Sequence, residues 1–515
     1  MSAETLLASD FGPLRDLIHA HAVERPDHPA IVEGTQTLTY GALAALMDRV
    51  AVALQRDGVR GGDVVAICAP TSMRYGAAFC GILAAGAAVA PLAPSSTAAS
   101  LIMMLNDCGA KLLLLDRETA EALEGAGLQL ARRIALDDSN AGEPFSGWLG
   151  PDGAAPYKVA IAPEQPFNII YSSGTTGAPK GIVQPHGMRW GQFKRLVYKD
   201  AVMVVSTPLY SNTTLVAYLP TLAHGSTAVL LPKFDAGQFL RISQERRATH
   251  AMLVPVQYRR IMEREDFGKY DLSSYVLKLS TSAPFPAALK ADVLERWPGG
   301  LVEIYGLTEG GGATMLVAHQ FPHKLHTVGK PMAGHDIRLI DDDGREVEGG
   351  RVGEVVGRSE MMMGGYHNLP EKTREAVWHD AEGRRFIRTG DIGRFDEDGF
   401  LILLDRSKDL IISGGFNIYP SDIEAELVRH EAVVEAAVVG VASERWGETP
   451  VAFVALRQGA AIDGPKLMKW VNARLGKTQR ISELRLIESL PRSAIGKVLK
   501  RELRDLYTKA TPNNK

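Results

Sequence analysis

The feature that most constrains the fold of this 515-residue chain is an alternation along roughly its first 400 residues. Short apolar runs, rich in Val, Ile and Leu, alternate with longer segments of helical periodicity such as 234–249. The runs are bounded by polar residues, Gly or Pro, and they predict buried strands at 63–68, 111–116, 167–171, 202–206, 227–232, 250–255 and 276–280. Such alternation is typical of α/β layers, in which helices cover both faces of a parallel sheet. We therefore predict an α/β fold.

The pattern changes in the last third of the chain. From about Gly329 to residue 404, short strands with Asp-Gly turns predict a small β-rich subdomain of the first domain, 1–404. The polar tetrapeptide 405–408 separates two strand-like runs and marks a boundary. The second domain, 409–515, has an α+β pattern. We expect a helix that begins with Ser421 as its N-cap, a second helix at 464–476, and strands at 432–441, 450–456 and 483–489.

Composition excludes several classes of protein. Lys and Arg number 57 and Asp and Glu 60, so the net charge of −3 gives no electrostatic reason to expect a nucleic acid or an anionic membrane as partner. With 45% hydrophobic and 23% charged residues, the chain is not intrinsically disordered. Cys68, Cys80 and Cys108 lie in apolar contexts without metal-binding spacing, and we expect buried thiols. No secretory signal is recognisable, and the chain is predicted to be cytoplasmic.

One uncharged stretch, 75–106, is long enough to span a bilayer. It consists mainly of Ala, Gly and Ser, which contribute little to insertion, and Pro91 and Pro94 interrupt it. We therefore predict a buried helix at about 71–85 followed by a short strand at 86–94, and no integral membrane segment.

The strongest local motif is YSSGTTGAPKG at 171–181, directly after a predicted strand. Glycines allow a turn whose amides converge on an anion, hydroxyls add donors and Lys180 adds positive charge, which suits the polyphosphate of a nucleotide. The residues concerned are Ser172, Ser173, Gly174, Thr175, Thr176, Gly177 and Lys180. The loop is not a Walker A motif, because Pro179 precedes the lysine and Gly181 follows it. The alternative is a surface turn rich in Ser, Thr and Gly.

This motif resembles the phosphate-loop signature of the adenylate-forming superfamily, which includes acyl-CoA synthetases, nonribosomal adenylation domains and beetle luciferases. Five further signatures of that superfamily follow in the same order, at 305–309, 389–391, 405–408, 414–418 and 491–497. The chain is therefore identified as similar to this superfamily, in its acyl- or aryl-CoA ligase branch. The resemblance implies a large N-terminal α/β domain and a small mobile C-terminal domain.

The resemblance also implies the roles of the nucleotide-binding residues. A carboxylate is a poor acyl donor, and joining it to the α-phosphate of ATP creates a mixed anhydride, so that positioning and charge neutralisation dominate catalysis. Glu309 would hold Mg²⁺, Thr308 would contact the α-phosphate, and Lys497 would bridge the carboxylate and the phosphate. The alternative for Lys497 is a solvated lysine in a basic run. The remaining implied nucleotide ligands are Ala283, Pro284, Tyr305, Gly306, Asp391 and Arg406.

A second half-reaction, attack of a thiol on the acyl-adenylate, needs a rearranged site. By resemblance, Lys408 is the hinge, and Gly414 and Gly415 line the passage of pantetheine, although these glycines could instead form a turn. Arg445 would meet a phosphate of CoA, the alternative being an exposed salt-bridging arginine.

The acid is the least determined component. Ser211 occupies the position at which many family members carry His, and Thr281-Ser282 replaces the commoner Gly-Gly before Ala283-Pro284. Aromatic and small residues predict an acyl pocket for an aryl or medium-length apolar acid, unless these aromatics are ordinary core. The pocket residues are Trp190, Tyr210, Ser211, Tyr258, Gly310 and Gly311.

We therefore expect an ATP- and Mg²⁺-dependent carboxylate–CoA ligase of fatty-acid or aromatic-acid metabolism, with an acid, ATP and CoA as its small-molecule partners. Three alternatives remain: a ligase that loads a separate carrier protein, an oxygenase of luciferase type, and a non-catalytic nucleotide-binding homologue. The sequence leaves a homodimer open.

Overall fold

The structure, a computed structural model, describes residues 1–127, 132–172, 179–348, 350–406, 408–413, 416–443, 445–476, 479–493 and 496–510. The chain divides into two compact units. The first comprises Met1–Ile337 and Gly357–Ile387, and the second Arg338–Val356 and Arg388–Lys515. Each unit is described by itself.

The first sheet of the first unit has the strand order β16-β15-β14-β13-β12-β10-β11-β1-β2. Its strands from β14 through β1 are parallel, whereas the pairings β1–β2, β14–β15 and β15–β16 at the two edges are antiparallel. The bounds are β1 Pro29–Glu33, β2 Gln36–Thr39, β10 Val202–Val205, β11 Thr227–Leu230, β12 His250–Leu253, β13 Leu277–Ser280, β14 Gly300–Gly306, β15 Ala313–Val317 and β16 Lys330–Pro331. The apolar runs at 202–206, 227–232, 250–255 and 276–280 are confirmed as strands, and they are parallel because helical crossovers separate them.

The second sheet has the order β19-β9-β8-β4-β3-β5-β6-β7, parallel from β8 to β7 and antiparallel at β8–β9–β19. Its strands are β3 Val64–Cys68, β4 Ala88–Pro91, β5 Leu112–Leu115, β6 Arg133–Ala135, β7 Glu143–Pro144, β8 Pro166–Ser172, β9 Lys180–Pro185 and β19 Gly365–Tyr366. β19 comes from a distant part of the sequence, and this pairing brings it beside the strand that follows the predicted phosphate loop.

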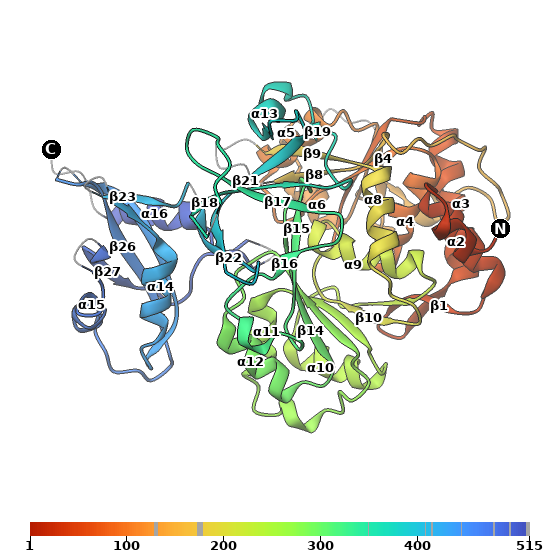
Figure 1. Cartoon of the computed structure of the whole chain (residues 1–515). Coiled ribbons are helices and arrows are strands. Elements are labelled where there is room, and N and C mark those ends of the chain that lie inside the picture. The colour runs from red at the N-terminus through yellow and green to blue at the C-terminus, as the bar shows by residue number, and fades with distance from the viewer. Residues whose placement is uncertain are drawn as a thin grey trace. The chain divides into compact units, whose positions relative to one another are not determined.

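Helices lie beside both sheets (Figure 1). They are α1 Ala3–Ala8, α2 Leu14–Glu24, α3 Tyr40–Arg56, α4 Met73–Ala84, α5 Ala98–Asp107, α6 Arg117–Ala122, α7 Phe145–Trp148, α8 His186–Arg195, α9 Asn212–Ala223, α10 Ala236–Glu245, α11 Pro255–Met262, α12 Ala287–Arg296 and α13 Pro370–Glu375, with 3-10 turns Phe267–Lys269 and Pro322–Lys324. The α/β fold class is confirmed.

The helix and the short strand predicted in the uncharged stretch are confirmed as α4 and β4, and residues 75–92 are buried. The helix α4 packs in the core that α2, α3 and α9 share. The rest of the stretch is partly exposed and forms most of α5. The Ser72 side chain caps α4 by accepting from the amide of Tyr75. Among the described residues, no helix is both long and apolar enough to cross a bilayer. The three cysteines are free and buried, and burial raises the pKa of Cys68 to about 12.

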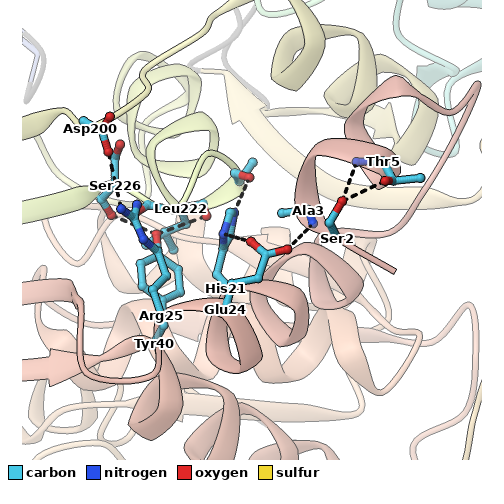
Figure 2. A network of polar contacts seen from close by, with 12 residues as sticks. Ser2, Ala3, Thr5, His21, Glu24, Arg25, Tyr40, Asp200, Leu222 and Ser226 are labelled. Atoms are coloured by element: carbon cyan, nitrogen blue, oxygen red, sulfur yellow. Dashed lines mark hydrogen bonds and ion pairs between the residues drawn. The ribbon is translucent and has the colours of Figure 1, made fainter.

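Side chains from the N-terminal helices hold the C-terminal end of α9 (Figure 2). The Tyr40 hydroxyl donates to the carbonyl oxygens of Leu222 (3.1 Å) and Ser226 (2.8 Å). His21 and Arg25 contact two further carbonyl oxygens of this end, at 2.9 Å each. The carbonyls of Leu222 and Ala223 belong to the last turn of α9 and lack partners within the helix, and these contacts supply them, whereas Gly225 and Ser226 lie just beyond the helix. They fix the end of α9 that lies opposite Asn212.

A further sheet joins β17 Asp336–Ile340, β18 Gly353–Arg358, β20 Val377–His379, β21 Arg385–Phe395 and β22 Leu401–Arg406. The division between the two units passes through these strands. The short strands predicted after Gly329 are thus present. The extents of the domains, 1–404 and 409–515, stay predictions.

The C-terminal part of the second unit has the strand order β24-β23-β26-β25, with β27 on β26. Its elements are β23 Ile411–Ser413, β24 Phe416–Ile418, α14 Pro420–Val428, β25 Val433–Ser443, β26 Gly447–Leu456, α15 Gly464–Asn472, β27 Glu483–Leu486 and α16 Lys500–Ala510. One prediction is wrong: Tyr419, not Ser421, is the N-cap of α14. Pro420 takes the first helical position, which suits its fixed φ and missing N–H, and the Ser421 hydroxyl bonds the carbonyl of Leu404 instead.

Candidate functional site

Two residues expected at the nucleotide meet on a third side chain that sequence reasoning missed. Tyr366 on β19 donates a hydrogen bond of 2.9 Å from its hydroxyl to Oε1 of Glu309. The Nζ of Lys180 lies over the ring of Tyr366, 5.2 Å from its centroid. β9 and β19 are antiparallel, with Tyr366 opposite Ile182, and this pairing places the ring beside Lys180. A single phenol thus touches the predicted phosphate lysine and the predicted magnesium carboxylate.

The backbone around Glu309 is held closely by the segment before β19. The amide of Met363 donates to the carbonyl of Glu309 (2.8 Å), and the amide of Gly311 donates to the carbonyl of Met361 (3.0 Å). Gly310 has φ +73°, and a Cβ there would overlap the carbonyl oxygen of Met361. Gly311 has φ +87° and a Cβ there would crowd Gly357. Close backbone approach therefore accounts for the glycine run. Its predicted role as the floor of an acyl pocket stays a prediction.

The phenol of Tyr366 is a donor at neutral pH. Burial and, next, the neighbouring Glu309 carboxylate raise its pKa well above the ordinary value. The second carboxylate oxygen of Glu309 has no hydrogen-bond or ion-pair partner among the residues that the structure describes. An oxygen ligand with a free lone pair suits Mg²⁺, which is usually bound by one or two carboxylates together with substrate phosphates. No cluster of three acidic, His or Cys residues that could hold a metal occurs in the described ranges.

A buried polar cluster lies next to these residues and was also missed. The guanidinium of Arg189 on α8 is fully buried and donates to Oδ1 of Asn168, to Oε1 of Gln184, to Oε1 of Gln192 (2.9 Å) and to Oδ1 of Asn212 (2.9 Å). Within the described part of the chain, no carboxylate pairs with it. Burial lowers the pKa of Arg189 to about 9, so it remains charged at neutral pH.

The cluster reaches the family signature at 305–309. Nε2 of Gln184 on β9 donates to the carbonyl oxygen of Thr308 (2.7 Å) and to Oδ1 of Asn212 (3.2 Å). The strand β14 ends at Tyr305 and Gly306, which lie opposite Thr314 and Ala313 on β15. Thr308 thus follows the strand directly and is held by Gln184 from the second sheet.

The loop before α12 is tied to α9. The Ser282 hydroxyl is 2.5 Å from that of Thr213, and Ser282 has φ +80°. A non-glycine residue in this region is strained, at a cost of about 1–3 kcal/mol. Ala283 and Pro284 follow in the same loop. This is the position at which the sequence departs from Gly-Gly, and the left-handed φ explains why glycine suits it.

The aromatic residues predicted for the acyl pocket come from different segments of the chain. Trp190 is buried against Phe11, and its indole nitrogen is 3.4 Å from the carbonyl oxygen of Ser9. Tyr258 stacks on Phe285 (5.0 Å between centroids) and donates to a backbone carbonyl. Tyr210 and Ser211 immediately precede α9, and burial raises the pKa of Tyr210. Membership of all four in an acyl pocket stays a prediction.

Some predicted positions lie outside the described residues, namely Ser173, Gly174, Thr175, Thr176, Gly177, Gly414 and Gly415. Ser172, the last residue of β8, is opposite Lys180 in the register of β8 and β9. The two ends of the predicted phosphate loop are therefore adjacent strand partners.

Within the second unit, Asp391 and Arg406 come together. They face each other across β21 and β22, and Nε of Arg406 lies 3.1 Å from Oδ1 of Asp391. The carboxylate is buried and the guanidinium is more exposed. Two of the implied nucleotide ligands are thus neighbours on one sheet.

Lys497 lies at a turn of the second unit. The amide of Ser493 donates to the carbonyl of Lys497 (2.8 Å), Gly496 has φ +77°, and Arg492 forms an ion pair with Glu435. The lysine is partly exposed. The residue therefore lies on an anchored loop.

Two further predicted residues of this unit are exposed. Lys408 follows β22, and the guanidinium of Arg445 stacks on Trp446, 4.7 Å from the ring centroid. The proposed roles of Lys408 as hinge and of Arg445 at CoA stay predictions.

The fold and this set of groups define an adenylate-forming enzyme. The chain belongs to the AMP-binding enzyme family: the model of that family matches residues 18–367, and the model of the AMP-binding enzyme C-terminal domain matches residues 422–497. The resemblance seen in the sequence is confirmed.

Individual relatives match over nearly the whole chain. Feruloyl-CoA synthase of Amycolatopsis sp is 33% identical over 93% of this chain and 96% of its own length. The long-chain-fatty-acid–CoA ligase FadD13 of Mycobacterium tuberculosis is 29% identical over 96% and 99%. Among solved structures, the amide bond synthetase McbA of Marinactinospora thermotolerans superposes with a TM-score of 0.86 at 27% identity, covering 96% of this chain and 100% of that one.

Proposed function

We propose that this protein is an ATP-dependent carboxylate–CoA ligase. It activates a carboxylic acid as acyl-AMP with release of pyrophosphate and then transfers the acyl group to CoA. Membership of the AMP-binding enzyme family and the curated CoA-ligase relatives support this class of activity. The observation that carries the proposal is the convergence of Lys180 and Glu309 on the phenol of Tyr366. The cation of Lys180 lies over the face of the ring, and the carboxylate that we propose to bind the metal accepts from its hydroxyl.

The first half-reaction requires two anions to approach each other. Lys180 binds phosphate oxygens, and the free oxygen of Glu309 binds the Mg²⁺ that accompanies ATP; the metal supplies charge neutralisation at the phosphates. Thr308 contacts the α-phosphate, and its carbonyl, held by Gln184, keeps it in place. Asp391 accepts hydrogen bonds from the ribose hydroxyls, since a carboxylate can accept two, and Arg406 orients it.

The second half-reaction needs the catalytic lysine out of the way. We assign Lys497 to adenylation, Lys408 to the hinge between domains 1–404 and 409–515, and Gly414, Gly415 and Arg445 to the binding of CoA. The match to the family model of the C-terminal domain includes Lys497.

We propose that the acid substrate is an aryl acid or an apolar acid of medium length. A relative whose name specifies feruloyl-CoA and one whose name specifies long-chain fatty acids both support an apolar acyl group. We place the enzyme in the cytoplasm, where ATP and CoA are available, and propose that it forms a homodimer, which size-exclusion chromatography with light scattering tests.

The test is pyrophosphate release with a panel of acetate, octanoate, benzoate and ferulate, first without and then with CoA. Pyrophosphate with an apolar acid, followed by CoA consumption, supports the proposal. Acetate as the preferred acid contradicts the apolar pocket, and no pyrophosphate with any acid favours a non-catalytic homologue.

The acceptor has a second candidate, because the solved neighbour McbA is named an amide bond synthetase. Adenylation without CoA consumption, but with amide formation when an amine is added, would assign an amine acceptor. Adenylation that proceeds to product only with an added carrier protein would assign the pantetheine arm of that protein.

A further inference from the structure

The orientation of the side-chain amides around Arg189 can be worked out from hydrogen-bond chemistry. An arginine guanidinium has only donors, so any amide group that contacts it must present its oxygen. Arg189 contacts Asn168, Gln184 and Asn212 in this way. Asparagine and glutamine amides are easily assigned the wrong way round, but a donor-only neighbour that is fully buried removes that ambiguity.

The outward-facing nitrogens then follow one by one. Nδ2 of Asn168 donates to Oε1 of Gln184 (2.8 Å). Nε2 of Gln184 donates to Thr308 and to Asn212. Oδ1 of Asn212 accepts from both Arg189 and Gln184, so its Nδ2 points away from the cluster. This Nδ2 has no acceptor among the residues that the structure describes.

The position of Asn212 indicates what this Nδ2 donor can bind. It is the first residue of α9, is partly exposed, and follows Ser211. Gln184 joins it to the carbonyl oxygen of Thr308, and Thr213 joins the same turn of α9 to Ser282. The amide therefore lies between the motif proposed to contact the α-phosphate and the loop of Ala283 and Pro284.

We propose that Asn212 contacts the substrate: its Nδ2 donates a hydrogen bond to a carboxylate oxygen of the acid that is to be adenylated. Arg189 is the positioning residue that fixes this orientation. The inference rests on the proposed function for the identity of the substrate.

The chain offers a sharp test, because Asn212→Asp separates structure from binding. A carboxylate in this place accepts from Arg189 and Gln184 as the amide does, and it gains an ion pair with Arg189, so the melting temperature is expected to stay equal or to rise. The same change replaces the donor by an anionic oxygen facing the substrate. The dissociation constant of the acid, and its KM in pyrophosphate release, are expected to rise by about tenfold or more, with the KM for ATP changed less than threefold.

The matched control is Gln192→Glu. Gln192 accepts from Nη1 of Arg189 and takes no part in the contacts to Gln184, Thr308 or Asn212. Gln192→Glu therefore gives Arg189 a carboxylate partner without altering the Nδ2 donor of Asn212. The dissociation constant of the acid is expected to stay within threefold of the wild-type value. Asn212→Leu provides a second route to the loss of the donor if Asn212→Asp does not fold.

Acid binding is measured directly, from the concentration dependence of the melting temperature with octanoate, benzoate and ferulate, so the result does not depend on turnover. Wild-type binding without pyrophosphate release would contradict the proposed function and leave this inference standing. Unchanged acid affinity in Asn212→Asp or Asn212→Leu overturns the inference. So does an equal loss in Gln192→Glu, which would assign the effect to the charge of Arg189.

Discussion

Replacement of Tyr366 by Phe removes one atom from the candidate site and should act on the metal. Phe keeps the ring over which Nζ of Lys180 lies at 5.2 Å, whereas the 2.9 Å hydrogen bond to Oε1 of Glu309 is lost. A hydrogen bond to a charged group contributes about 1.5–3 kcal/mol, and 1.4 kcal/mol corresponds to a factor of ten. Loss of a partner that orients a metal-binding carboxylate commonly costs about 10–100-fold in metal affinity. The Mg²⁺ concentration for half-maximal rate is therefore expected to rise by about 10–100-fold.

The assay is pyrophosphate release at saturating acid, without CoA, with Mg²⁺ varied at fixed ATP. Tyr366→Leu also removes the cation–π contact with Lys180, worth about 0.5–2 kcal/mol, and should raise the KM for ATP as well. Tyr270→Phe is the control, because the Tyr270 hydroxyl also donates to a carboxylate, that of Asp266 (3.4 Å), outside the candidate site. An unchanged Mg²⁺ requirement in Tyr366→Phe, or an equal shift in Tyr270→Phe, would refute the reasoning.

Three further predictions concern other parts of the chain. Lys497→Ala should abolish pyrophosphate release yet leave thioester formation from supplied acyl-adenylate largely intact, and an equal loss of both steps would contradict the division of labour. Gly310→Ala should lower the free energy of unfolding by about 1–3 kcal/mol, because Gly310 has a positive φ and a Cβ there would overlap with Met361. Gly147→Ala has open space around the new methyl group and should change the free energy of unfolding by less than about 1 kcal/mol. Urea unfolding measures both variants, and equal effects would refute the packing argument. Burial lowers the pKa of His186 to about 4, whereas the ordinary pKa of histidine is about 6.5, so the unfolded chain binds more protons than the folded chain between these two pH values. About 3 kcal/mol of the free energy of unfolding is therefore present above pH 6.5 and is lost as the pH falls towards 4. His186→Phe should flatten the melting temperature against pH in that window, and an unchanged slope would show that other groups govern it.

The strands were predictable because buried parallel strands are short continuous apolar runs. The run at 276–280 becomes β13, and that at 63–68 becomes β3. The order in which the strands pair could not be predicted from the sequence. The pairing of β1 with β11, for example, joins residues about 200 positions apart, and no local pattern encodes such a pairing. The N-cap of α14 was predicted wrongly because Pro420 occupies the first helical position, so that the N-cap is the residue before it, Tyr419.

The site shows the same division. Glu309 and Lys180 could be found, because each lies in a motif whose residue types suit phosphate and metal. Tyr366 and Arg189 could not, because their contacts arise from β9 meeting β19 and from α8 packing on β8. An isolated tyrosine after two glycines, or one arginine in a helix, carries no signal of such partners. The sequence could not indicate the ring neighbours of Trp190 and Tyr258, which are Phe11 and Phe285, because these contacts arise from tertiary packing.

The contacts that hold the end of α9 have a consequence for how the chain is made. During synthesis, Tyr40 leaves the ribosome long before its acceptors, Leu222 and Ser226. Its hydroxyl, with His21 and Arg25, must stay hydrated while more than 180 residues are added, as the sequence separation of 182 between Tyr40 and Leu222 shows. The first segment to emerge therefore completes these contacts only after the helix that begins at Asn212 has been made.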